Sequence, residues 1–296
     1  MITLGALAAL HEQYADLMAA PITPVRVSDD VVIGDDAITL MGVVNLSRDS
    51  TYRESIAGST EAAVRKGRVQ TEQGARIIDL GAEASGDDAD RVGPDEQLEK
   101  LLPVVEELSQ HTVVSVETYR PPVVRAVLDA GARMINMTGR EDEDEMLTAV
   151  AEHDATLLMC FGTSANVREQ DELPADTDLA PFLVDHFAER IEHARSLGVD
   201  KIVVDPGMGF TFPNLTGLER ADLQTRTVTQ NFRLRSLGVP TGSVLPHNLD
   251  IFEDEFRKAE GFFTVFAALG GVHLLRVHEV PHIRTVLRAL DTLGVK

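Results

Sequence analysis

Short apolar segments recur through the chain, and nearly every one ends in a polar residue able to do chemistry. Segments of this length, rich in Val and Ile and separated by stretches of helical pattern, predict a parallel sheet whose strands are buried on both faces. Eight such units predict a (β/α)8 TIM barrel, in which the active site lies at the C-terminal ends of the strands. Turns also favour Asn, Asp and Glu, so strand ends can carry these residues without a function. The eight segments are TLMGVVN (39–45), ARIIDLGAE (75–83), TVVSVE (112–117), ARMINM (132–137), ATLLMC (155–160), KIVVD (201–205), VPTGSVLPHN (239–248) and GVHLLRVH (271–278).

The length of 296 residues suits one barrel of about 250 residues with an N-terminal extension. Residues 4–19 have the spacing of an amphipathic helix that lies outside the barrel. The stretch DDVVIGDD (29–36) predicts a hairpin that closes the bottom of the barrel. The predicted organisation is therefore an N-terminal helical extension, residues 1–37, and a TIM-barrel domain, residues 38–296.

Stretches with helical spacing lie between the predicted strands, as the barrel requires. Four glycines stand just after such a stretch and just before a strand, where a helix ends in a left-handed conformation: Gly74, Gly131, Gly198 and Gly238. The predicted helices are 60–75, 94–109, 120–131, 142–153, 179–197, 216–237, 253–270 and 280–294.

The formal net charge of −21 predicts a surface that repels nucleic acid and anionic lipid, so neither is an expected partner. An acidic surface with few lysines suits either a salt-rich cytoplasm or a biased genome. Cys160 is the single cysteine, which excludes an intrachain disulfide and a Cys-cluster metal site. The chain shows no cleavable leader and no apolar run of about 18 residues, which predicts a cytoplasmic protein.

Two segments carry the most specific chemistry. In VVDPGMGF, Asp205 ends a strand before a tight turn, so its carboxylate would face the barrel mouth and accept paired hydrogen bonds from an aminopyrimidine edge. A buried Asp that only caps the following turn is the alternative. In LLRVHEV, alternation along the strand puts Arg276 and His278 on one face, which predicts an anion site for a leaving phosphate.

Six segments together resemble the successive signatures of dihydropteroate synthase, in order and at matching spacing, over roughly residues 38–290. They are MGVVNLSRDS, GARIIDLGAEAS, VVSVETYRPPVVRAVLDAGARMINM, ATLLMC, IVVDPGMGF and LLRVHEV. The resemblance implies a transferase of folate biosynthesis. Such an enzyme joins 6-hydroxymethyl-dihydropterin diphosphate to p-aminobenzoate or a related amine and releases diphosphate.

The resemblance also implies roles for individual residues. Asn136 and Asp205 would bind the pterin, with Glu117 in the place of the family's Asp, and Met159 and Phe210 would line the pterin pocket. Further substrate-binding positions implied by the resemblance are Ser85, His247 and Asn248.

The diphosphate would be held by Asn45, Arg276 and His278, with Mg2+ bound near Asn45. Asp205, Arg276 and His278 are the predicted catalytic residues. Expelling diphosphate leaves positive character on a methylene conjugated to the pterin ring. A carboxylate near the ring and cations on the leaving group would therefore lower the barrier. No covalent nucleophile is required, so Cys160 is interpreted as a packing residue.

The chain departs from the family in two loops. Leu245-Pro246-His247-Asn248 stands where the family has Ser-Arg-Lys, so both cations are missing. In loop two, Ala84-Ser85-Gly86-Asp87-Asp88 replaces Ser-Thr-Arg-Pro-Gly, which removes an Arg and adds two acids near the expected phosphates. Arg48, Arg53 or Arg91 could substitute for these cations from another direction.

Three functions therefore stay open at this stage. The intact DPGMGF and RVH segments favour a divergent synthase, whereas the acidic GDDAD segment favours the other two. These are a paralogue that binds a pterin or folate without synthase chemistry, as the pterin-binding barrels of corrinoid methyltransferases do, and a non-catalytic barrel.

The predicted assembly is a homodimer. The stretch 253–270 clusters Phe256, Phe262, Phe263 and Phe266, which is more apolar surface than one outer helix face usually needs. The same aromatic cluster could instead pack on the barrel wall.

Overall fold

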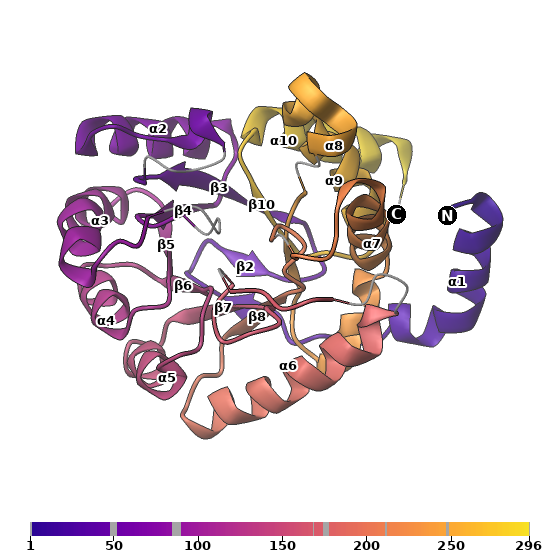
Figure 1. Ribbon diagram of the computed structural model, residues 1–296, viewed down its shortest axis with the longest axis horizontal. Helices are drawn as coiled ribbons and strands as arrows, with labels where there is room; N and C mark the ends of the chain where they lie inside the picture. Colours follow the sequence, from indigo (N-terminus) through magenta and orange to yellow (C-terminus); the bar gives the residue numbers. More distant parts are fainter. Residues whose placement is uncertain are drawn as a thin grey trace.

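The computed structural model describes residues 2–47, 52–84, 90–167, 169–173, 178–210, 212–246 and 249–295. Eight parallel strands form a nearly closed barrel with helices between them, which confirms the predicted TIM barrel (Figure 1). A bridge between Val204 and Thr241 joins the two ends of the ladder. In ladder order the strands are β8 (Ile202–Asp205), β7 (Thr156–Cys160), β6 (Met134–Met137), β5 (Val113–Thr118), β4 (Ile77–Gly81), β3 (Thr39–Asn45), β10 (Leu274–Val277) and β9 (Gly242–Val244).

The outer helices follow the predicted stretches, with two exceptions. The predicted helix 216–237 is two elements, α7 (Gly217–Thr229) and the 3-10 helix η2 (Asn231–Leu237). The predicted helix 253–270 is also two elements, the 3-10 helix η3 (Glu253–Lys258) and α9 (Ala259–Leu269), and a short helix, α8 (Leu249–Phe252), precedes it. Glu253 has a left-handed φ of 45°, which an α-helix cannot continue through. The remaining outer helices are α2 (Thr60–Gln73), α3 (Pro94–Leu108), α4 (Pro121–Asp129), α5 (Glu143–Glu152), α6 (Leu179–Ser196) and α10 (Val280–Leu293).

The four glycines predicted to end helices do so, because Gly74, Gly131, Gly198 and Gly238 all have φ between 70° and 115°. Each therefore turns the chain from an outer helix toward the next strand.

Alternation along the strands separates two apolar layers. One lies between the strands and the outer helices and includes Val44, Leu80 and Met137. The other fills the inside of the barrel at the N-terminal ends of the strands, where Met41 and Ile77 lie. On β4, β5, β6, β8 and β10 the next inward position is polar, so chemistry is concentrated at the C-terminal end of the barrel: Asp79, Ser115, Asn136, Asp205 and Arg276.

The predicted hairpin exists, but it begins earlier in the chain than DDVVIGDD. Antiparallel β1 (Val25–Arg26) and β2 (Val32–Ile33) form it. Val25, Val27, Val31 and Ile33 pack in the inner apolar layer of the barrel, so the hairpin plugs its bottom as predicted. The hairpin starts at Val25 because alternate valines on both of its arms, and not only the VVI segment, face the barrel.

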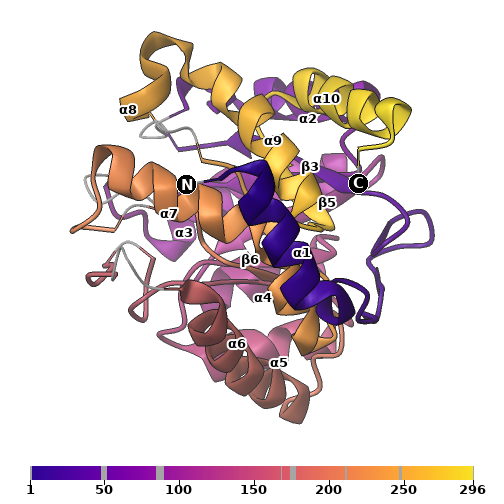
Figure 2. The same cartoon turned by 90° about the vertical axis from the view of Figure 1, so that its right-hand side faces the viewer.

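The N-terminal helix α1 (Leu4–Met18) has no buried residue and lies outside the barrel (Figure 2). It packs on η2, where the Tyr14 and Phe232 rings lie 5.9 Å apart and the Arg233 guanidinium lies 4.8 Å from the centroid of Tyr14. The domain boundary at residue 37 stays a prediction. Of the helices in the described ranges, none combines the length and apolar character that a membrane span needs.

Candidate functional site

A cup of polar side chains lies at the C-terminal end of the barrel, inside the ring of strands. Parallel pairing brings these positions level with one another: Asp79 lies beside Ser115, Glu117 beside Asn136, and Cys160 beside Asp205. The inward-facing residues of the cup are Asn45, Asp79, Ser115, Glu117, Asn136, Cys160, Asp205 and Arg276.

Arg276 lies at the centre of the polar cup and binds two carboxylates. Its Nε donates to Asp79 Oδ2 at 2.7 Å, and its Nη2 donates to Glu117 Oε2 at 2.6 Å. Ser115 Oγ donates to the other Asp79 oxygen at 2.6 Å, and Asn136 Nδ2 donates to Asp79 Oδ2 at 3.1 Å. Asp79 therefore links three strands to β10 and fixes the direction of the guanidinium.

Burial has opposite effects on the two signs of charge in the cup. It raises the pKa of Glu117, whereas the positive charge of Arg276 opposes this rise. Burial also disfavours the charge of Arg276, but the carboxylates of Glu117 and Asp79 outweigh this effect, so the pKa of Arg276 is raised. Arg276 therefore keeps its proton while Glu117 holds a proton more readily than an exposed Glu.

Asp205 ends β8 with both carboxylate oxygens already accepting backbone hydrogen bonds. Gly207 N donates to Oδ1 at 2.7 Å and Val244 N donates to Oδ2 at 2.9 Å. Burial nevertheless raises the pKa of Asp205 to about 6. Gly207 has a φ of 74°, and a Cβ there would lie 2.4 Å from the Phe161 carbonyl oxygen, so only glycine fits this turn.

The predicted pocket residues divide between the two faces of the barrel wall. Phe210 packs against the inner apolar layer, which is compatible with a pocket role. Met159 is fully buried in the outer layer, so the prediction that it lines the pocket is wrong. Cys160 takes the inward position instead, and its Sγ donates to Asn136 Oδ1 at 3.2 Å. Burial raises the pKa of Cys160 well above its ordinary value, which keeps the thiol neutral and unreactive.

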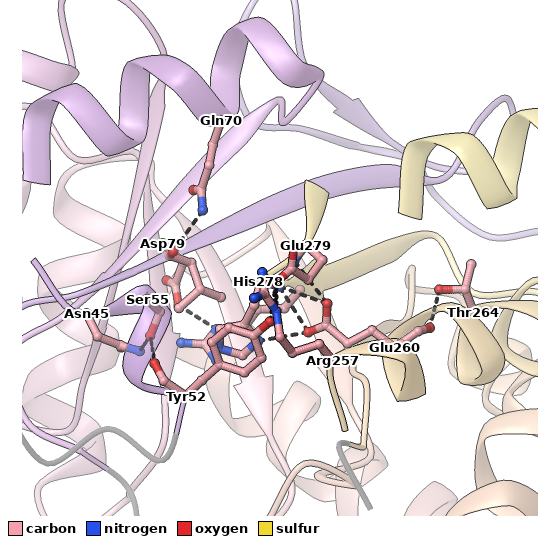
Figure 3. Close-up of polar contacts among 12 residues, drawn as sticks. Asn45, Tyr52, Ser55, Gln70, Asp79, Arg257, Glu260, Thr264, His278 and Glu279 are labelled. Carbon is pink, nitrogen blue, oxygen red and sulfur yellow. Dashed lines mark hydrogen bonds and ion pairs between the residues drawn. The ribbon is translucent and has the colours of Figure 1, made fainter. Parts of the chain in front are cut away.

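His278 is held from a different direction than Arg276. Its Nδ1 lies 2.8 Å from Glu260 Oε1 of the outer helix α9, and its ring stacks on Tyr52 with centroids 4.3 Å apart (Figure 3). Arg276 is bound inside the cup, whereas His278 is bound at its edge. The prediction that the two share one anion site stays a prediction.

Asn45 ends β3 and connects the cup to the following loop. Its Nδ2 donates to Ser55 Oγ, and Ser55 Oγ donates to the Tyr52 carbonyl at 2.6 Å within the 3-10 helix η1 (Arg53–Ser55). A Cβ on Gly81 would lie 3.4 Å from Asn45 Oδ1 and 3.8 Å from Glu117 Oε2, so both oxygens flank the same small space. The glycine keeps this space open.

These oxygens are ligands that Mg2+ accepts, but the protein supplies few of them. Among the residues that the structure describes, no group of three or more His, Cys, Asp or Glu could hold a metal. Mg2+ usually binds one or two protein oxygens together with substrate phosphates and water. The donor set therefore fits an ion that arrives with a diphosphate, and not a dedicated metal site.

A cation lies at the rim beside loop two. Arg91 Nη1 donates to Tyr119 Oη at 2.8 Å and Arg91 Nη2 donates to Glu169 at 2.7 Å. Tyr119 Oη donates to Glu83 at 2.8 Å, and the Arg120 guanidinium lies 4.6 Å from the centroid of the Tyr119 ring. Two guanidinium groups thus gather on one tyrosine near the place of the missing loop-two Arg.

Some predicted residues lie outside the described part of the chain: Arg48, Ser85, His247 and Asn248. Sequence reasoning also missed residues that the structure places in or near the site: Tyr52, Asp79, Ser115 and Glu260. Ser115 carried a usable signal, because it is two residues before Glu117 on its strand and so faces the same way. Asp79 carried a weaker one, because it is two residues before Gly81, which has no side chain to mark the face. Glu260 carried no such signal, since it lies on the outer helix α9 and not on a strand of the barrel.

Eight parallel strands with a charged cup at their C-terminal ends define a barrel protein with a ligand site at its mouth. A family model described as pterin binding enzyme matches residues 41–278. Dihydropteroate synthase of Escherichia coli (strain K12) is 30% identical over 264 residues, which cover 87% of this chain and 92% of that protein. Dihydropteroate synthase of Synechocystis is 28% identical over 266 residues, covering 86% and 89%.

Solved structures agree with these relatives. Dihydropteroate synthase of Xanthomonas albilineans with 4-aminobenzoic acid superposes with a TM-score of 0.77 at 26% identity, covering 93% of this chain and 99% of that one. A probable bifunctional folylpolyglutamate synthase/dihydropteroate synthase of Halobacterium salinarum is 30% identical over 260 residues, and the chain spans about a third (31%) of its length. The chain belongs to the dihydropteroate synthase family of pterin binding enzymes.

Proposed function

We propose that this transferase joins 6-hydroxymethyl-dihydropterin diphosphate to p-aminobenzoate or a related amine and releases diphosphate, in folate biosynthesis. The observation that carries this proposal is the cup itself. Asn136 and Asp205 lie on β6 and β8, and Arg276 lies on β10 across the barrel from β6. The cup therefore holds both hydrogen-bonding groups for an aminopyrimidine edge and a cation for a leaving diphosphate, and Asp79 Oδ2 joins the two by accepting from Asn136 Nδ2 and Arg276 Nε. No feature of the described residues favours a pterin-binding barrel without synthase activity.

In this proposal Asp205 and Asn136 orient the pterin, and Phe210 packs on it. Glu117 faces the methylene, where a carboxylate favours the positive character that develops as the diphosphate leaves. Arg276 and His278 stabilise the leaving group. The amine attacks the methylene carbon as the C–O bond to diphosphate breaks, and the new C–N nitrogen then loses a proton to solvent. Asn45 would hold Mg2+ on the diphosphate, where the ion neutralises phosphate charge.

Arg91 and Arg120 are the proposed substitutes for the cations that the family carries in its loops. Their position supports this role. Both donate to the Tyr119 hydroxyl, which in turn donates to Glu83, a residue shortly after β4 and just before loop two. Both guanidinium groups would need to turn from Tyr119 toward the mouth to meet a phosphate. Residues Ser85, His247 and Asn248 keep their proposed substrate contacts.

We also propose a homodimer through the aromatic face of α8 and α9. Phe262 is 48% exposed and Ile251 is 47% exposed, although the Phe262 ring contacts those of Phe252, Phe263 and Phe266 in tilted or edge-to-face pairs. Exposed aromatic side chains of this kind favour association with a second apolar surface. A cytoplasmic location stays a prediction.

The test of the synthase proposal is a turnover assay with purified protein, the pterin diphosphate, p-aminobenzoate and Mg2+. Release of diphosphate with formation of dihydropteroate is the expected result. Asp205→Asn should remove most activity, because the amide has only one accepting oxygen and cannot accept the paired hydrogen bonds proposed from the aminopyrimidine edge of the pterin. Binding of the pterin diphosphate with no turnover for any tested amine would contradict the proposal.

A further inference from the structure

A carboxylate is buried in an otherwise apolar outer helix. Glu260 is the second residue of α9, in the segment AEGFFTVFAAL, and it is 0% exposed. Burial of an ionised carboxylate is costly unless hydrogen-bond donors surround it. The packing of an outer helix does not require a charge at a buried position. The role of Glu260 therefore has to be inferred from the groups that bind its carboxylate.

The segment that follows β10 supplies donors to both oxygens of the Glu260 carboxylate. His278 N donates to Oε1 at 3.0 Å and to Oε2 at 3.1 Å, and Glu279 N donates to Oε2 at 3.1 Å. His278 Nδ1 lies 2.8 Å from Oε1. The side chains of Glu260 and His278 are 1% and 7% exposed. The carboxylate therefore fixes both the backbone and the ring of His278 (Figure 3).

A second contact fixes the plane of the same ring. The Tyr52 and His278 rings stack at 4.3 Å with 15° between their planes. Tyr52 Oη donates to Glu279 Oε1, and Arg257 Nε donates to the same oxygen at 2.7 Å. Because Nδ1 is held by Glu260 and the ring face by Tyr52, the direction of Nε2 is set as well.

We propose that Glu260 is a positioning residue that aims His278 at the leaving diphosphate and favours its doubly protonated form. The inference rests on the proposed function in one respect, that His278 meets diphosphate. A buried anion beside an imidazole favours the imidazolium, which is the form that binds phosphate most strongly.

Other charged and titratable groups also surround the ring. Tyr52 stacks on it from the segment before η1, and Glu279, the next residue in the chain, binds both Tyr52 and Arg257 of η3. The Glu260 carboxylate contacts the ring nitrogen Nδ1 itself.

The test is a titration with inorganic diphosphate between pH 6 and pH 9, for the wild type, Glu260→Gln, His278→Gln and the double variant. Glu260→Gln should weaken binding about tenfold, as loss of a charge-assisted hydrogen bond does. Its binding should also decline at a lower pH than that of the wild type, since the imidazolium loses its favouring anion. In the His278→Gln background, Glu260→Gln should add less than about twofold, because both changes act through one ring.

A matched control separates positioning from folding. Glu143→Gln breaks another poorly exposed ion pair, the one with Arg190 at 2.6 Å, far from His278 on α5 and α6. It should lower Tm and leave the diphosphate profile unchanged. If Glu260→Gln does not fold, Glu260→Asp keeps the charge, so its profile should keep the pH dependence of the wild type with weaker binding.

Superposable pH profiles for Glu260→Gln and the wild type would overturn the inference, as would a wild type that binds no diphosphate. The proposed function fails in a different way. A wild type that binds diphosphate with the expected Glu260 dependence, but forms no dihydropteroate, would leave the positioning role standing and remove the synthase reaction.

Discussion

Arg276 is a single cation shared by two buried carboxylates. Asp79 is 0% exposed and the side chain of Glu117 is 11% exposed, so neither carboxylate can rely on water if the guanidinium is removed. This arrangement directs the guanidinium before any ligand arrives. A diphosphate must therefore compete with or extend the existing pairs, and does not meet an unengaged cation.

Arg276→Met should destabilise the fold by about 3–5 kcal/mol, because it leaves two buried carboxylates without their partner. The measurement is urea unfolding at pH 7.5 followed by circular dichroism. Arg125→Met, which breaks the exposed pair with Glu152, is the control and should have little effect. Equal losses for the two variants would show that the buried network does not stabilise the barrel.

The pKa of Asp205 gives a pH dependence with a definite sign. Because burial raises this pKa to about 6, the carboxylate is largely neutral below that pH and ionised above it. The affinity for 6-hydroxymethylpterin should then rise about tenfold from pH 5 to pH 7, as the acceptor form becomes populated. Calorimetric titration would measure it, and Asp205→Asn should give weak, pH-independent binding. A flat profile for the wild type would exclude Asp205 as the acceptor.

The same group affects folding in the opposite direction. In the unfolded chain an Asp ionises near pH 3.9. Between that pH and about 6, the unfolded state therefore binds fewer protons than the folded state at Asp205. This residue alone lowers stability as pH rises through that window, and a bound pterin that favours the carboxylate should offset the loss.

Residue by residue, the sequence predicted which side chains form the polar cup better than it predicted the hydrogen bonds among them. Asn136, Asp205 and Arg276 could be predicted because each ends a strand with a side chain unlike its apolar neighbours. Met159 was misassigned because a resemblance fixes the segment but not the face. Counting by twos from the inward Leu158 would have selected Cys160. The partners of Arg276 depend on which strands lie across the barrel, which no local pattern contains.

At the scale of elements, one arginine of η2 holds the segment between α1 and the β1–β2 hairpin and the segment after the hairpin. Arg235 Nε donates to the Ala20 carbonyl at 2.8 Å, and its two Nη atoms pair with Asp35 at 2.7 and 3.0 Å. His273 lies beside the same pair, 3.1 Å from Asp35. Because α1 buries no residue, its position depends on the anchored Ala20 that follows it as well as on the packing of Tyr14 against η2.

Arg235→Gln should therefore loosen the N-terminal segment before it unfolds the barrel. We expect faster proteolytic cleavage within residues 2–24 and a loss of about 1–3 kcal/mol, since the Ala20 carbonyl and the half-exposed Asp35 lose their hydrogen bonds to the guanidinium. Limited proteolysis with mass spectrometry checks the first effect. Arg226→Gln, which breaks the i,i+4 pair with Asp222 on α7, is the control. Unchanged cleavage in Arg235→Gln would contradict this account of how α1 is held.

The aromatic face of α8 and α9 gives a second prediction at this scale. Phe262→Glu should convert the proposed dimer to a monomer with little change in stability, because about half of this ring is exposed in the single chain. Light scattering coupled to gel filtration measures the mass. Phe263→Leu, a change at a fully buried neighbour, is the control and should stay dimeric. A monomeric wild type would rule out the dimer itself.

Element boundaries could be predicted where a residue type forces them and not elsewhere. Gly74 and Gly131 end helices because their left-handed conformation excludes most side chains. The interruption at Glu255, inside the predicted helix 253–270, has no such signal, since a glutamate within a helical pattern predicts that the helix continues. The break between α7 and η2 has no such signal either. The position of η2 depends on a tertiary contact, the hydrogen bond from Arg235 to Asp35, which lies 200 residues earlier in the chain and is not visible in the local sequence.

At the scale of the whole molecule, the fold was predictable because the same unit occurs eight times. An error in one strand or helix leaves the other units to specify the barrel, and the two broken helices changed nothing in the strand order. The site lacks this redundancy. Each cup residue occurs once, so each error in its face or partner changes the chemistry inferred.

The net charge also belongs to the whole molecule. The chain carries 48 acidic and 27 basic residues, so most exposed acids have more like charges than opposite charges near them. Mutual repulsion of this kind favours expansion over the compact state. Salt shortens the range of the repulsion from about 10 Å at 0.1 M to about 3 Å at 1 M, and buried pairs such as Arg276 with Asp79 are screened much less.

Tm should therefore rise by several degrees between 0.05 M and 1 M KCl at pH 7.5, measured by differential scanning calorimetry. The control is the same series at pH 5, where acidic side chains begin to gain protons, the repulsion is weaker and the rise should be smaller. A rise of equal size at both pH values would point to general salt effects on hydration, because those do not depend on the charge of the protein. A fall in Tm with salt at pH 7.5 would show that exposed ion pairs stabilise the fold more than net repulsion destabilises it.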